Sequence, residues 1–154
     1  MLRALLPLDG SANALGAVRH VIRLDKDREP LEIHLLNVQP PVHGDVTMFV
    51  GGAAVREFHE SCSLQALASA CRLLDDDAVP YTRHVAVGHV ARVIAAWASR
   101  LDCDTVVMGT RGLGTMTQLL HGSVINDVIH QLAPGITVTL VKDCIATHLI
   151  EESR

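Results

Sequence analysis

Two glycines and a Gly-Ser pair are the residues of this chain best suited to bind an anion. Gly109 and Gly112 come directly after the apolar run 105–108, and Gly122-Ser123 follows after nine intervening residues, where a helical pattern starts. Glycine has no Cβ, so its N–H group can approach a ligand closely, and the first amides of a helix lie at the positive end of the helix dipole. The spacing predicts a phosphate-binding loop. The alternative is a plain strand-to-helix connection in which Ser123 is only the N-cap.

The order of apolar runs and helical patterns indicates which fold positions this loop. They alternate from end to end, which predicts an α/β class protein with a parallel sheet covered on both faces. With 154 residues and 49% hydrophobic content, the chain suits one domain. We expect strands at 2–8, 31–38, 81–87, 105–108 and 136–141, helices at 11–24, from about 53 to 75, 91–101 and 124–132, and an irregular loop over 39–52.

With these residues in place, the chain resembles the universal stress protein family, whose ATP-binding type carries G-x2-G-x9-G-[S/T] after the fourth strand. The family also begins with a strand ending in an acidic residue, here Asp9, followed by a Ser-led helix, here from Ser11. The resemblance covers roughly residues 2 to 142. It implies a doubly wound five-stranded parallel sheet of order 3-2-1-4-5, formed by a domain of residues 1–143 and followed by a tail of residues 144–154.

The resemblance also implies where the nucleoside part of an adenine nucleotide would bind. The adenine would lie against Pro7, Leu8 and Val38, and the backbone of Val38 would read its edge. The Asp9 carboxylate would accept hydrogen bonds from the ribose hydroxyls. A second role for Asp9 is to cap the turn before the first helix.

The phosphates would lie along the glycine loop. Arg111 either makes a charge-assisted contact with a phosphate or points to solvent. A divalent ion, Mg²⁺ or Mn²⁺, would be carried by the phosphates of ATP, because the loop offers no cage of carboxylates. The residues implied for the ribose and the phosphates are Met108, Gly109, Gly112, Gly122, Ser123 and Val124.

No catalytic set is visible in the sequence. The nine histidines are scattered, and neither H-E-x-x-H nor G-x-S-x-G occurs. Without a general base aimed at a γ-phosphate, we expect binding with at most slow hydrolysis. His89 and His121 depart from the family pattern, and each is either a solvated loop residue or a group that makes nucleotide affinity pH-dependent.

Charge and cysteine usage limit the partners and the compartment. A net charge of −4 and a pI near 6.1 argue against nucleic acid as a partner. No run approaches the ~20 apolar residues of a membrane span and no leader pattern opens the chain, so we expect a cytoplasmic protein that binds no membrane. The cysteines lack C-x-x-C spacing and read as free structural thiols: Cys62, Cys71, Cys103 and Cys144.

The last expected strand predicts the assembly. Residues 136–141 form an uncharged, β-branched run at the edge of a 3-2-1-4-5 sheet, and pairing with a second copy would cover that edge. The tail could instead fold over the edge and keep the chain monomeric. The expected function is a homodimeric ATP-binding stress protein acting as a nucleotide-responsive signalling or protective module. The alternatives are a nucleotide-independent homodimeric interaction module and a slow ATPase.

Overall fold

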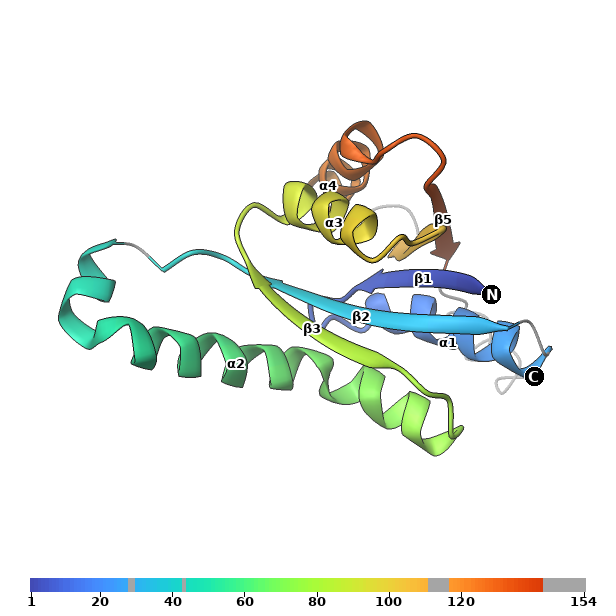
Figure 1. The fold of residues 1–154 in the computed structure, drawn as a ribbon, viewed down its shortest axis with the longest axis horizontal. Coiled ribbons are helices and arrows are strands. Elements are labelled where there is room, and N and C mark those ends of the chain that lie inside the picture. The colour runs from blue at the N-terminus through green and yellow to red at the C-terminus, as the bar shows by residue number, and fades with distance from the viewer. Residues whose placement is uncertain (28–29, 43, 111–116, 143–154) are drawn as a thin grey trace, which may run out of the picture.

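A five-stranded parallel sheet forms the centre of the molecule (Figure 1). The computed structural model describes residues 1–27, 30–42, 44–110 and 117–142, with backbone only for 44–50 and 117–123. The strand order β3-β2-β1-β4-β5 confirms the predicted class and topology. The strands are β1 (Leu2–Pro7), β2 (Leu31–Gln39), β3 (Thr82–Val87), β4 (Thr105–Thr110) and β5 (Thr137–Lys142).

Helices cover both faces of the sheet. Helices α1 (Ala14–Lys26) and α2 (Gly44–Asp76) lie on one face, and α3 (Val90–Arg100) and α4 (Thr117–Gln131) lie on the other (Figure 1). Successive side chains of a strand point to opposite faces. Leu6 of β1 therefore packs with residues of α1 and α2, whereas its neighbour Leu5 packs with residues of α3.

The loop expected over residues 39–52 is wrong in part. Helix α2 already begins at Gly44 and is interrupted at Gly51, whose φ of 79° and ψ of 160° are not helical. Glycine adopts a positive φ without steric cost, so one residue separates two helical segments. Residues on both sides of this break are helical, whereas the sequence predicted an irregular loop as far as residue 52. The resulting long helix extends past the sheet (Figure 1).

Two other helix starts differ from the prediction. Helix α1 begins at Ala14 rather than Ser11, after a turn formed by residues 9–13. Helix α4 begins at Thr117, so Gly122 and Ser123 lie inside it rather than at its N-terminus. Gln and Leu, which precede these residues, favour helix, and one interior glycine costs only about 1 kcal/mol relative to alanine. The expectation that Ser123 caps this helix is therefore wrong.

Candidate functional site

A crevice lies at the carboxyl end of the sheet, where β1 and β4 are neighbours. The chain leaves β1 toward α1 on one face and leaves β4 toward α4 on the other, so the two connections diverge. This divergence is the topological switch point at which doubly wound sheets bind ligands. The cavity there has a volume of about 250 Å³.

Many residues predicted from the sequence line this cavity. They come from the ends of three strands and from α4: Pro7, Leu8, Asp9, Val38, Met108, Gly109 and Val124. Residues Gly122 and Ser123 lie in α4, directly before Val124, with their side chains outside the description. Arg111 and Gly112 lie outside the described residues.

The crevice has further walls that the sequence reasoning missed. They are contributed by the turn before α1, by α3 and by neighbours of predicted residues: Ser11, Asn13, Ala14, Leu36, Val90, Ile94 and Ile125. A signal existed for Leu36, because it lies two residues before Val38 and so on the same face of β2. For Val90 and Ile94 there was none, since only the packing of α3 on β2 brings them to the crevice.

Gly109 is required by packing within the fold. It lies in β4, paired with Val141, rather than in a loop after the strand. A Cβ added at this position would collide with the backbone oxygen of Asn13 and lie 3.0 Å from its carbonyl carbon. Only a residue without a side chain lets β4 approach the turn before α1 this closely.

Asp9 begins the turn between β1 and α1. Its Oδ1 accepts a hydrogen bond from the Ser11 N–H at 2.9 Å, so the turn-capping role weighed from the sequence is present. The carboxylate is exposed at the rim of the crevice. An ionised carboxylate has about four acceptor sites, so this bond is compatible with additional donors.

The crevice walls suit a flat apolar group with a polar attachment. The deeper walls are aliphatic, from residues such as Leu36, Val38 and Ile94, whereas Asp9, Ser11 and Asn13 supply polar atoms on the α1 side. The volume lies below the ~300–1,000 Å³ typical of pockets that enclose a whole drug-sized ligand. The cavity therefore suits the base and sugar of a nucleotide better than an entire triphosphate.

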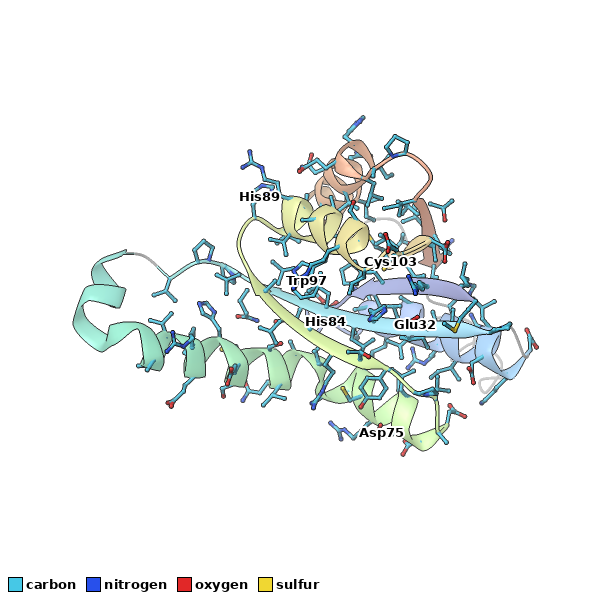
Figure 2. The ribbon with its side chains drawn as sticks, in the orientation of Figure 1. Glu32, Asp75, His84, His89, Trp97 and Cys103 are labelled. Atoms are coloured by element: carbon cyan, nitrogen blue, oxygen red, sulfur yellow. The ribbon has the colours of Figure 1, made fainter. Side chains whose placement is uncertain are left out.

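A second polar cluster lies outside the crevice and is formed by residues of β2, β3 and α3. His34 contacts His84, and the His84 ring lies 4.8 Å from the Trp97 ring, measured between centroids (Figure 2). Burial, followed by His34 and the Arg100 guanidinium, lowers the pKa of His84 from its ordinary 6.5. None of these residues lines the crevice.

The two histidines singled out from the sequence differ in what the structure describes. His89 is exposed and precedes α3 as its N-cap, without a side-chain capping hydrogen bond (Figure 2). His121 lies within α4, with its side chain outside the description. Across the described parts of the chain, no three His, Cys, Asp or Glu side chains are grouped as a metal site would require. Within the same residues, no helix is both long and apolar enough to span a membrane.

Sequence comparison identifies relatives over nearly the whole chain. The model of the universal stress protein family matches residues 1–141. A universal stress protein of Methanocaldococcus jannaschii is 27% identical over 133 residues, which are 82% of this chain and 75% of that protein. A universal stress protein of Synechocystis is 26% identical over 148 residues, 88% of this chain and 96% of its own.

Solved structures share the fold. A universal stress protein family member from Arabidopsis thaliana with AMP bound has a TM-score of 0.68 at 16% identity, covering 96% of this chain and 95% of its own. The universal stress protein from Archaeoglobus fulgidus in complex with dAMP has a TM-score of 0.61 at 16% identity, covering 92% and 98%. These two proteins of the same fold thus hold adenine nucleotides.

Proposed function

Because the chain belongs to the universal stress protein family, we propose that it binds ATP in the crevice between β1 and β4. In this proposal the bound nucleotide alters which partner the protein engages, so that it acts as a signalling or protective module in the cytoplasm. The observation that carries the proposal is the crevice itself. Aliphatic walls and a carboxylate at the rim meet at the switch point of a fold whose relatives hold AMP and dAMP.

The residues that line the cavity suggest where the base and the ribose would bind. Adenine is proposed to lie between the Val38 and Met108 ends of β2 and β4, where it buries its apolar faces. The ribose hydroxyls are then proposed to donate to Asp9, whose Oδ1 also accepts from the Ser11 N–H. The polar atoms of Ser11 and Asn13 border the same side of the cavity.

Binding of the phosphates by the predicted amides requires the first turns of α4 to unfold. The amides of Gly122, Ser123 and Val124 lie beyond the first four N–H groups of a helix that begins at Thr117, and so are committed to intrahelical bonds. They become donors to phosphate only when residues 117–122 leave the helix. A Mg²⁺ or Mn²⁺ ion would be held by the phosphates, since the described residues form no carboxylate cage.

We propose binding with slow hydrolysis at most. Among the described lining residues, Asp9 is the single ionisable side chain, and its role on the ribose leaves it unavailable as a base for water attack. A faster ATPase would need an ionisable group from outside this lining.

A nucleotide-independent interaction module is the second candidate, and one observation favours it. Helix α4 runs through Gly122 and Ser123, so the phosphate donors are occupied within the helix. In both candidates we propose a homodimer through β5, which lies at one edge of the sheet and exposes Leu140 to 49%.

Mass spectrometry of nucleotide released from purified, denatured protein, together with calorimetry using Mg-ATP, separates the two candidates. ATP binding with micromolar affinity supports the first. An absence of heat at protein concentrations sufficient for that affinity, with no nucleotide released, supports the interaction module. Asp9→Ala is the matched variant, and we expect it to lower the affinity for ATP more than the affinity for 2′,3′-dideoxy-ATP.

A further inference from the structure

We infer that Asn37, a residue that does not line the crevice, positions the Asp9 carboxylate for the ribose hydroxyls of the nucleotide. Asn37 is a positioning residue in this inference, because its side chain acts through the main chain of Leu8 and touches no ligand. The inference rests on the proposed function, since it concerns the ribose end of that site.

The main chain of Leu8 is held by β2 on both sides. The β1–β2 pairing ends at Pro7 and Leu36, so Leu8 follows the last ladder pair. Its N–H still donates to the Leu36 carbonyl at 2.8 Å. Its carbonyl accepts a hydrogen bond from Asn37 Nδ2 at 2.7 Å, from a side chain that is 2% exposed. A side chain thus takes the place of the next backbone donor.

These two bonds fix where Asp9 starts. The peptide unit is planar, so holding the Leu8 carbonyl also holds the N–H and Cα of Asp9. From there the Asp9 side chain closes its turn by accepting from the Ser11 N–H. The adjacent Gly10 has a φ of 86°, and a Cβ added there would lie 3.1 Å from the Ala66 Cα, so α2 leaves no room for a side chain on this side of the turn. The carboxylate is therefore placed by the main chain although it is exposed.

Asn37 is itself held in one orientation. Gln39 Nε2 donates to Asn37 Oδ1 at 2.5 Å, and the Gln39 carbonyl accepts from the Gly88 N–H at 3.0 Å. If the Asn37 amide were flipped, its Oδ1 would lie against the Leu8 carbonyl oxygen and its Nδ2 would lie against Gln39 Nε2, and neither pair could form a hydrogen bond. Hydrogen bonds therefore run from the end of β3 through β2 to the end of β1, and they terminate next to Asp9.

This arrangement has a consequence for affinity. A carboxylate that is already oriented loses less conformational freedom when a ligand binds, and buried supporting bonds are what keep a binding group in place. Removing the Asn37 donor leaves the Leu8 carbonyl unsatisfied and frees the Asp9 turn. The lost binding free energy should come from contacts with the ribose hydroxyls, and contacts with the base should be unchanged.

The experiment compares Asn37→Leu with the native protein in calorimetry with Mg-ATP and with Mg-2′,3′-dideoxy-ATP. Leucine has the same branching and the same number of side-chain heavy atoms as asparagine, and it removes the donor. We expect the affinity for ATP to fall about fivefold, the effect of one lost hydrogen bond. The affinity for the dideoxy analogue should change less than about twofold. In the double variant with Asp9→Ala, ATP should bind no more weakly than to Asp9→Ala alone. Equal weakening of both nucleotides would assign Asn37 to fold stability and overturn the inference.

A second readout needs no nucleotide. In the ligand-free protein we expect the Ser11 amide hydrogen to exchange faster in Asn37→Leu, because its acceptor on Asp9 is no longer fixed. Unchanged Ser11 exchange in a folded variant also overturns the inference. If Asn37→Leu does not fold, Gln39→Leu loosens the same amide from a half-buried position and should shift both readouts in the same direction.

The matched control is Thr105→Val. It removes the part-buried hydrogen bonds that the buried residue Thr105 makes with Thr137 and Thr139, at the amino end of β4. We expect it to lower stability without changing the ratio of the two affinities or the Ser11 exchange. If native protein binds neither nucleotide, the proposed function fails, whereas the Ser11 exchange still tests the role of Asn37 in the turn.

Discussion

His34 Nδ1 lies 3.1 Å from His84 Nε2, on neighbouring strands β2 and β3. On its other side, His34 Nε2 lies 3.1 Å from Glu32 Oε1, and Glu32 Oε2 is paired with Arg3 Nε at 3.1 Å (Figure 2 labels Glu32 and His84). An ionised carboxylate only accepts, so the His34 proton belongs on Nε2 and Nδ1 accepts from His84. The hydrogen bond between the two rings can form when one of them is an imidazolium. If both rings were protonated, an N–H group on His34 Nδ1 would face an N–H group on His84 Nε2.

This relationship predicts a pH dependence of folding stability. The pKa of His84 is lowered in the folded protein by burial, by His34 and by Arg100, while the unfolded chain keeps the ordinary value of about 6.5. The unfolded state therefore binds more protons in this range, so stability rises with pH. The contribution of neutral His84 is present above pH 6.5 and is lost as the pH falls below it.

Urea unfolding at pH 8, 7, 6 and 5.5 checks this expectation with His84→Phe, which keeps a ring beside Trp97 and removes the titrating group. The loss of stability in acid should be smaller in the variant than in native protein. His89→Gln is the control, because His89 is exposed and makes no capping bond. Parallel pH profiles for native protein and His84→Phe would contradict the assignment.

Gly109→Ala should destabilise the fold. The new methyl group would collide with the backbone of Asn13, and a backbone atom cannot turn aside as a flexible side chain can. We expect a loss of about 1–3 kcal/mol, the usual cost of overpacking. Gly52→Ala is the matched control in α2, since nothing lies within 4 Å of its added Cβ. Alanine should change stability little there, because Gly52 begins the second helical segment of α2. Chemical denaturation of both variants gives the comparison, and equal stability of the two would refute the packing role.

ATP binding should open the start of α4. If the Gly122 and Ser123 amides turn to phosphate, residues 117–122 lose their helical hydrogen bonds. Hydrogen exchange followed by mass spectrometry should then show faster exchange in this segment with Mg-ATP than with adenosine, which has no phosphate. The segment 92–98 of α3 serves as the internal reference. Equal exchange with both ligands would mean that α4 stays closed and that the phosphates bind elsewhere.

The proposed dimer through β5 predicts the effect of one edge substitution. Leu140 is 49% exposed on the edge strand, so Leu140→Lys should cost the monomer little and should place like charges across a paired edge. Light scattering over a range of concentrations should show a dimer for native protein and a single-chain mass near 16.6 kDa for the variant. Ile129→Lys, 47% exposed on α4, is the control and should remain dimeric. A Leu140→Lys dimer would move the interface away from β5.

The sequence by itself determined the fold class, the strand order through its family resemblance, and much of the crevice lining. Alternating apolar runs and helical patterns report local periodicity directly, and the carboxyl ends of β1, β2 and β4 meet at one edge whenever the sheet is parallel. The family resemblance implied Pro7, Val38 and Met108, the end of the first strand gave Asp9, and all four line the cavity.

The tertiary structure decided what depends on residues far apart in the chain. Gly109 was predicted as a phosphate-loop glycine, and folding adds a second requirement, because its missing side chain accommodates Asn13, nearly a hundred positions earlier. The bond from Asn37 to the Leu8 carbonyl and the contact of His34 with His84 join separate strands. Local patterns cannot report such contacts, because they arise only when distant segments are brought together by folding.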